Sequence, residues 1–325
     1  MEGTRSNRRD YAIEILRWIS ILAVVAHHGV FLERYSATTV QCILEFKRTI
    51  GWCVVAFFAI SGALMKSDTP FPTLVSSRAR RLLVPYVAVS VLSFALIWTV
   101  NRSGIYHTSD FATSGDWPLL FRNILQLNGY GPQLYFLPYL FFVTVIFRGL
   151  LQFLSPSVAI AVLFCGLCAQ AIWTPWPVGS LGPGWDKWLL YTFAFALGHW
   201  FKNSLDGRTR VRLLVLLSAT ACGGLAAAAL GKSWPIDLVV PFWIYAALKC
   251  WTPGPMFKKI LDRFNPGAIF LWHAPFLLAA ISVGLNRLGI VQGWNYLGSC
   301  ALVVPAALCI DKMVRKLGLK GIFSF

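Results

Sequence analysis

Hydrophobic residues in this chain gather in long runs, separated by short stretches that carry Pro, Gly and charged residues. About 20 predominantly apolar residues are enough to cross a bilayer as an α-helix. Clusters of Pro and Gly at 175–177, 182–184 and 253–255 mark breaks between runs. The pattern predicts an all-α integral membrane protein with about ten spans, at residues 12–33, 48–66, 82–101, 133–148, 155–174, 186–202, 211–230, 236–252, 266–286 and 294–313.

Composition supports the membrane class. Hydrophobic residues make up 57% of the 325 positions, charged residues only 13%, and the mean hydropathy is +0.63. A soluble domain usually carries about 25% charged residues. The ten expected spans and their short loops leave no room for a soluble domain, so we expect one polytopic membrane domain over residues 1–325.

Basic residues are distributed unevenly between the two sets of loops. Most of the 29 Lys and Arg residues fall in the segments that would share a side with both termini. By the positive-inside rule, both termini are expected in the cytoplasm, which requires an even number of spans. The loop at 102–132 is then external. This bias explains the net charge of +16, and we expect no nucleic-acid partner.

The first apolar run contains three ionisable residues, Glu14, Arg17 and His28. At 100° per residue, His28 returns to within about 20° of Arg17 around the helix and lies roughly 16 Å along it. Glu14 lies one turn before Arg17 on the same side. Ionisable groups inside a membrane helix are costly and mark functional sites. The alternative is that Arg17 snorkels to the interface beside Glu14 while His28 bonds within the bundle. His27 points about 100° away from His28, and we expect it to be a packing or interfacial residue.

Three arginines, Arg78, Arg80 and Arg81, precede the third predicted span. Guanidinium groups bind phosphates in bidentate fashion, so this cluster is a candidate phosphate site. The alternative is an anchor that touches anionic lipid head groups. The eight Cys residues fall mostly within apolar runs, where Cys behaves as a small hydrophobic residue. We expect no metal site.

These features together resemble the acyltransferase 3 family of bacterial integral membrane O-acyltransferases. Its first helix carries an Arg, ten residues and then a His, which Arg17 and His28 match; Glu14 matches an acidic residue three positions before the Arg. The usual small residue after the Arg is replaced by Trp18. Motifs of later helices also match, namely Phe57, Phe58, Ser61 and Gly62; the basic run from Arg78 to Tyr86; Leu134 to Pro138; and Phe270 to Pro275 around His273.

The resemblance implies transfer of an acyl group, most often acetyl, from cytoplasmic acyl-CoA to a hydroxyl of a cell-surface polysaccharide or lipid-linked sugar. It also implies a multi-pass protein of the bacterial cytoplasmic (inner) membrane. We expect none of the periplasmic hydrolase-like domain that some members carry, so the chain resembles the short, stand-alone subgroup. In this scheme acyl-CoA is a co-substrate, and its phosphates would bind Arg78, Arg80 and Arg81.

The catalytic roles follow from the chemistry of the side chains. A hydroxyl nucleophile needs a base with a pKa near neutrality, and His offers one without perturbation. His28 is the expected base, Arg17 would hold the donor or the developing oxyanion, and Glu14 would orient Arg17. A covalent acyl-His intermediate is an open alternative. His273 is a second candidate, and its alternative role is a hydrogen-bonded core residue.

Two other function classes compete with the enzyme. Buried His, Arg and Glu also serve proton relays in proton-coupled transporters. Against that class, the sequence shows no internal repeat and no paired broken helices. A non-catalytic membrane scaffold would leave Arg17 and His28 unexplained.

Overall fold

The computed structural model describes residues 10–29, 35–66, 68–102, 117–128, 133–173, 187–204, 236–251, 253–263, 266–319 and 322, and every regular element among these is helical. Helices occur at nine of the ten expected spans, and the run at 211–230 lies outside the described residues. Within the described part, three helical segments are long and apolar enough to cross a membrane, namely Phe71–Leu96, Phe136–Phe153 and Gln292–Lys316. The all-helical membrane class is confirmed; the number of spans and their orientation stay predictions.

The first helix, α1 (Tyr11–His27), begins at a well-formed N-cap. The Asp10 Oδ1 atom accepts hydrogen bonds from the backbone N–H groups of Ala12 and Ile13. Its Oδ2 atom accepts from the Tyr245 hydroxyl at 3.1 Å and from the Lys249 ammonium at 2.7 Å. Both partners belong to α11 (Ile236–Lys249), so Asp10 joins the start of α1 to the side of another helix.

The second expected span, 48–66, holds one helix, α3 (Trp52–Ala63), which begins after a break at Gly51. An additional amphipathic helix, α2 (Ala37–Thr49), precedes it in the segment expected to be a loop. The apolar pattern does not reveal α2, because this helix combines apolar positions such as Ile43 with Thr, Gln, Glu and Lys residues. Its mean hydropathy is therefore low. Almost every residue of α3 is buried, which places this helix at the centre of the core.

Close contact with α9 (Trp188–Ser204) fixes the position of α3. Gly62 of α3 lies against the Phe195 backbone, and Gly198 of α9 lies against the Ala59 backbone. A Cβ atom on Gly62 would be 2.7 Å from the Phe195 carbonyl carbon. The two glycines therefore let the helices touch through their backbones, as small residues do in membrane bundles.

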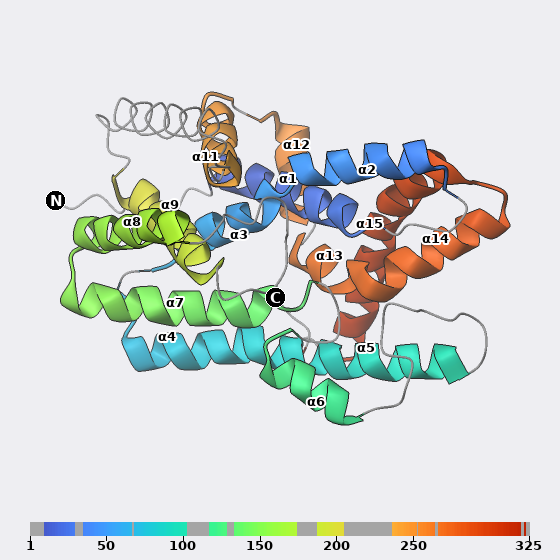
Figure 1. Ribbon diagram of the computed structural model, residues 1–325, viewed down its shortest axis with the longest axis horizontal. Coiled ribbons are helices and arrows are strands. Elements are labelled where there is room, and N and C mark those ends of the chain that lie inside the picture. Colours follow the sequence, from blue (N-terminus) through green and yellow to red (C-terminus); the bar gives the residue numbers. More distant parts are fainter. Residues whose placement is uncertain are drawn as a thin grey trace.

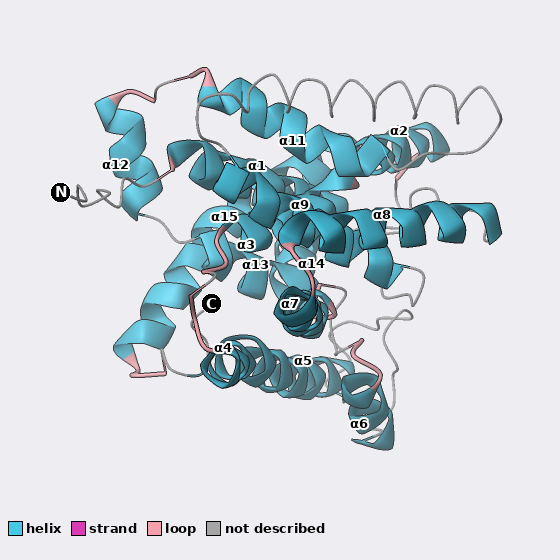
Figure 2. Cartoon of the chain, turned by 90° about the vertical axis from the view of Figure 1, so that its left-hand side faces the viewer, coloured by secondary structure: helices cyan, strands magenta, loops and turns pink. Residues whose placement is uncertain are grey.

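One nearly continuous helical rod forms a separate layer (Figures 1 and 2). It consists of α4 (Phe71–Arg78), a π-helical turn η1 (Ala79–Leu83) and α5 (Val84–Arg102). The short helix α6 (Trp117–Leu125) is attached to it, because the Tyr86 hydroxyl donates to the Ile124 carbonyl oxygen at 3.0 Å. α7 (Phe136–Phe153) packs against both the rod and α9 and so separates this layer from α1 in both views.

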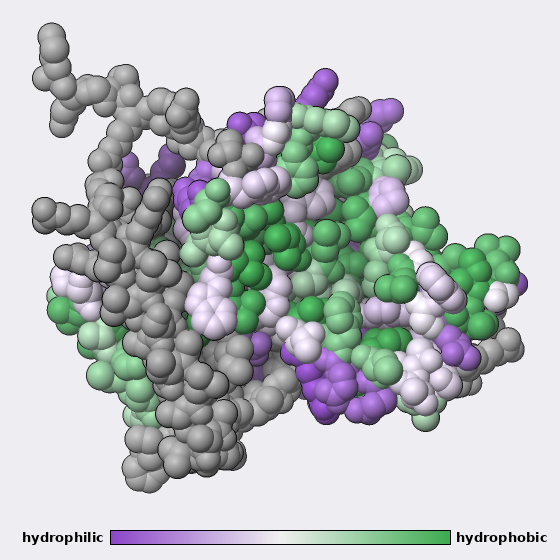
Figure 3. All heavy atoms as spheres, turned by 90° about the horizontal axis from the view of Figure 1, so that it is seen from above, coloured by the Kyte–Doolittle hydropathy of each residue, from purple (hydrophilic) through white to green (hydrophobic). Residues whose placement is uncertain are grey.

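The remaining helices complete the bundle: α8 (Pro156–Trp173) covers α9, and α12 (Pro255–Arg263) precedes the C-terminal group. That group comprises α13 (Pro266–Trp272), a π-helical turn η3 (His273–Leu277), α14 (Leu278–Arg287) and α15 (Gln292–Lys316). Large apolar side chains such as Leu22, Val162 and Leu297 are exposed, and much of the face in Figure 3 is hydrophobic. Such a surface suits lipid better than water.

Candidate functional site

Two histidines far apart in the sequence meet at the C-terminal end of α1. The ring centroids of His28 and His273 are 5.4 Å apart, and the rings are tilted by 44°. His28 follows the last residue of α1, whereas His273 opens the π-helical turn η3. The sequence analysis named both as candidates but gave no reason to place them together.

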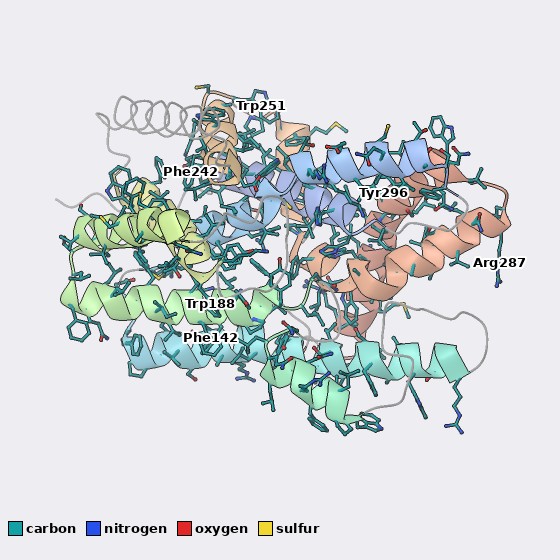
Figure 4. All side chains as sticks on the ribbon, viewed as in Figure 1. Phe142, Trp188, Phe242, Trp251, Arg287 and Tyr296 are labelled. Carbon is teal, nitrogen blue, oxygen red and sulfur yellow. The ribbon has the colours of Figure 1, made fainter. Side chains whose placement is uncertain are left out.

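The helix carrying His28 ends earlier than its apolar pattern predicted. The pattern continues to residue 33, but α1 ends at His27, and residues 30–34 lie outside the described part. The Tyr296 hydroxyl donates to the Ala26 carbonyl oxygen, and a Cβ atom on Gly29 would overlap the Tyr296 ring. Figure 4 shows Tyr296 on α15 beside this end of α1. Gly29 therefore permits the approach of an aromatic side chain that the sequence analysis did not connect with α1.

Hydrogen bonds fix the protonation pattern of His273. Its Nδ1 atom lies 2.8 Å from the Phe270 carbonyl oxygen and 3.1 Å from that of Ile269. A carbonyl oxygen can only accept, so Nδ1 carries the hydrogen, and the Nε2 atom of the neutral ring is an acceptor. The side chain is fully buried, and Nε2 has no hydrogen-bond partner among the described residues.

A break in the helix follows His273 immediately. Ala274 has extended backbone angles (φ −132°, ψ 158°), which interrupt the path from α13 to α14. The Gln133 side-chain amide donates to the Ala274 carbonyl oxygen, which the break leaves without its usual helical partner. Gln133 is almost completely buried, and the sequence analysis missed it.

Lys47 and His27 flank His28. The Lys47 ammonium donates to the Gly29 carbonyl oxygen at 2.7 Å, and His27 Nδ1 donates to the Lys47 carbonyl oxygen at 3.3 Å. The rings of His27 and His28 meet edge to face, 5.6 Å apart. Lys47 belongs to α2, which is too short and polar to span a membrane, and burial lowers the pKa of its ammonium to about 8. One hydrogen bond thus ties His27 to the backbone of α2.

A buried polar network holds the neighbouring helices. Asn295 of α15 accepts hydrogen bonds from the Tyr35 hydroxyl at 3.1 Å and the Ser282 hydroxyl at 2.6 Å. It donates in return to the Ser282 carbonyl oxygen at 2.8 Å. Because Tyr35 precedes α2, while Ser282 lies on α14, this network joins three parts of the chain near Tyr296.

Glu14 and Arg17 are half-buried on the N-terminal half of α1. The helix continues unbroken from Arg17 to His27, so the expected separation of roughly 16 Å between Arg17 and His28 stands. Arg17 and His28 therefore lie at two ends of one helix. An extended substrate would have to contact both.

The arginine cluster lies elsewhere. Arg78 is half-buried, and Arg80 and Arg81 are exposed, at the junction of α4 and η1. The expected start of this helix at residue 82 was wrong. The helical segment already begins at Phe71, so the three arginines lie within it. The cluster belongs to the rod layer, with α7 between it and α1 (Figures 1 and 2). The structure does not bring these side chains to His28.

The aromatic motifs from three helices meet one turn before His273. The ring of Phe57 on α3 lies 5.7 Å from Phe136 on α7 and 5.9 Å from Phe270 on α13, and the last two are 5.2 Å apart. Such edge-to-face contacts fix the relative positions of the helices. The motifs around Phe57, Phe136 and Phe270 therefore support the backbone that carries His273.

The described residues contain no group of three or more His, Cys, Asp or Glu side chains that could hold a metal ion.

Comparison with known proteins assigns the chain to a family. The model of the acyltransferase 3 family, described as an acyltransferase domain, matches residues 10–311, which is nearly the whole chain. The match includes α1, both histidines and the arginine cluster. No curated protein and no solved structure is significantly similar to the chain. The family gives no support to the transporter alternative. The chain belongs to the acyltransferase 3 family and is a membrane acyltransferase.

Proposed function

We propose that this protein transfers an acetyl group from cytoplasmic acetyl-CoA to a hydroxyl of a cell-surface polysaccharide or lipid-linked sugar. We place it as a single multi-pass domain, residues 1–325, in the bacterial inner membrane. The main support for the proposal is the position of His28. It lies at the end of an apolar helix, beside a second, buried histidine. Its family membership supplies the reaction class.

In the proposed reaction, His28 removes the proton from the acceptor hydroxyl as the oxygen attacks the thioester carbonyl carbon. The carbon–sulfur bond breaks, the acyl group stays on the sugar oxygen, and CoA leaves as a thiolate. The thiolate then takes up the proton from His28, which returns to its neutral form. A covalent route would differ only in that a His28 nitrogen attacks first and passes the acyl group on.

Arg17 and Glu14 act at the other end of α1. The guanidinium of Arg17 holds the donor at a point distant from the thioester carbonyl, because the oxyanion develops beside His28, and Glu14 orients Arg17. Because Arg17 lies roughly 16 Å from His28 along the helix, the donor contact suits an extended molecule. CoA is extended, since its thiol is separated from its phosphates by the pantetheine arm.

Arg78, Arg80 and Arg81 bind the CoA phosphates in this proposal. The exposure of Arg80 and Arg81 suits a contact with a soluble nucleotide. Because these arginines lie in the rod, apart from α1, we expect them to affect the affinity for the donor and not the rate of the chemical step. The basic-residue bias puts this end of the rod on the cytoplasmic side, where CoA is found, and the acceptor reaches His28 from the opposite side.

The test uses purified protein in lipid nanodiscs, with acetyl-CoA and candidate acceptor glycans. Release of CoA thiol that depends on the acceptor supports transfer, and mass spectrometry of the glycan locates the acetyl group. One equivalent of thiol released without acceptor would identify the covalent route. No release with any acceptor would refute the enzyme proposal.

The His28→Ala variant should lose about 10²–10⁴-fold in kcat, the range typical of a general base. His27→Ala is the matched control, because it removes an adjacent imidazole of the same helix end and should cost far less. Near-wild-type turnover in His28→Ala would show that the base is another group.

A further inference from the structure

We propose that His273 is the hydrogen-bond partner of protonated His28 during acyl transfer. In this role its Nε2 atom accepts a hydrogen bond from the imidazolium of His28 and stabilises the charge that forms there. His273 is then a positioning residue that acts through His28, and the proposal rests on the proposed function.

The first support is the hydrogen-bonding state of His273. Two backbone carbonyls hold its N–H at Nδ1, so the lone pair at Nε2 is available to accept. This atom is buried and has no partner among the described residues. Buried polar atoms are nearly always paired, and an exception in a native fold calls for an explanation. A partner that donates only during the reaction is such an explanation.

The second support is the position of the two rings. A centroid separation of 5.4 Å leaves their edges one small rotation from hydrogen-bond contact. His28 lies just beyond the last turn of α1, and its ring contacts the rings of His27 and His273. His273 is held by the backbone of α13, by the Gln133 bond to the following carbonyl, and by packing around Phe270. A fixed acceptor therefore lies beside the proposed base.

The third support is the charge around His28. Lys47, His27 and His273 all lie within electrostatic reach of its ring, and Lys47 carries a positive charge below pH 8. A proton on His28 would be disfavoured beside that ammonium. A neutral acceptor at Nε2 of His273 offsets this repulsion, because a charged N–H donor forms a stronger hydrogen bond than a neutral one.

The proton balance is the same as in the proposed reaction. His28 gains the hydroxyl proton as the carbon–oxygen bond forms, and its other N–H donates to His273 Nε2. When the CoA thiolate takes the proton from the catalytic nitrogen of His28, the charge disappears and the hydrogen bond from the other N–H to His273 weakens. His273 begins and ends neutral, with its hydrogen on Nδ1.

Two substitutions separate this role from a purely structural one. In His273→Asn, the side-chain amide lies near the position of Nδ1 and can still donate to the Phe270 carbonyl, but the acceptor at Nε2 is lost. In His273→Gln, the amide oxygen lies near the position of Nε2 and can accept from His28. We expect His273→Asn to lower kcat by at least about 10-fold with KM for acetyl-CoA unchanged, and His273→Gln to retain most of the wild-type kcat.

A structural role predicts the reverse order, because Asn keeps the bond to the backbone. An Asn variant as active as the Gln variant, or more active, would overturn the proposal. If the wild-type protein releases no thiol from acetyl-CoA, the proposed function fails, and this proposal fails with it. Wild-type transfer with a fully active Asn variant refutes only the role of His273.

A second measurement does not depend on the folding of these variants. The chain has five His residues, so ¹⁵N-histidine labelling gives a simple spectrum of imidazole nitrogens. We expect the rings of His27 and His273 to carry their hydrogen on Nδ1. The one that remains in His27→Ala is His273, and its Nε2 signal should shift in His28→Ala but not in His27→Ala. An unchanged signal in His28→Ala would refute the contact between the two rings.

Discussion

Replacement of Gly198 by Ala tests the central helix crossing, because the added Cβ has no space. It would lie 2.6 Å from the carbonyl carbon of Ala59 and 2.8 Å from its Cα atom. Ordinary van der Waals contact begins near 3.4 Å, and the Ala59 carbonyl oxygen lies closer to the added atom than these two carbons, so α3 and α9 must separate by more than about 0.8 Å. A gap of about 0.5–1 Å already loses a quarter to a half of each dispersion contact along an interface.

The obstacle is backbone, so no side-chain rotation relieves it. Overpacking typically costs 1–3 kcal/mol, and we expect Gly198→Ala to lie at the top of that range, at about 3 kcal/mol. That corresponds to roughly a 150-fold change in the folding equilibrium. The apparent melting temperature should fall by at least about 5 °C. Thermal unfolding in detergent, followed by size-exclusion chromatography with fluorescence detection, measures this shift.

Gly149→Ala is the matched control. Gly149 lies within α7, and a Cβ atom there would meet nothing within 4 Å. Because Ala is the better helix former, this variant should be unchanged or stabilised by up to about 1 kcal/mol. If Gly198→Ala melts within a degree of Gly149→Ala, the two helices do not touch through their backbones.

Three further predictions concern the site. Arg17→Lys should not restore transfer, because Lys keeps the charge but loses the planar fork; full activity in the thiol-release assay would favour the snorkelling alternative. The double variant Arg80→Gln with Arg81→Gln should raise KM for acetyl-CoA and leave kcat unchanged; equal donor affinity in titrations at matched folded amounts would instead indicate a lipid anchor. Because the pKa of Lys47 is lowered to about 8, its charge is lost as the pH rises through 8, and kcat/KM should rise there because the repulsion that opposes a proton on His28 disappears. Lys47→Arg should keep the charge and lack this rise, and superimposable profiles of kcat/KM against pH would exclude a role for the charge.

Hydrophobic patterning alone determined the class and most of the helices. A bilayer leaves no water to satisfy backbone groups, so apolar runs of sufficient length must form helices. The axial relation of Arg17 to His28 also followed from the sequence, because α-helical geometry fixes it and the helix is continuous between Arg17 and His27. The motifs identified the family for the same reason: they are local patterns of residue type and spacing.

Only the tertiary structure decided which side chains meet. His28, Lys47, His273 and Tyr296 come from four separate segments, and no local periodicity specifies contacts across such distances in the chain. The end of α1 at His27 depends on Tyr296 packing against Gly29, and the helix α2 was missed because its polar positions interrupt the apolar pattern. The hydrogen on Nδ1 of His273 depends on where its own helix breaks. These features result from packing between residues that are distant in the sequence, so local sequence patterns do not predict them.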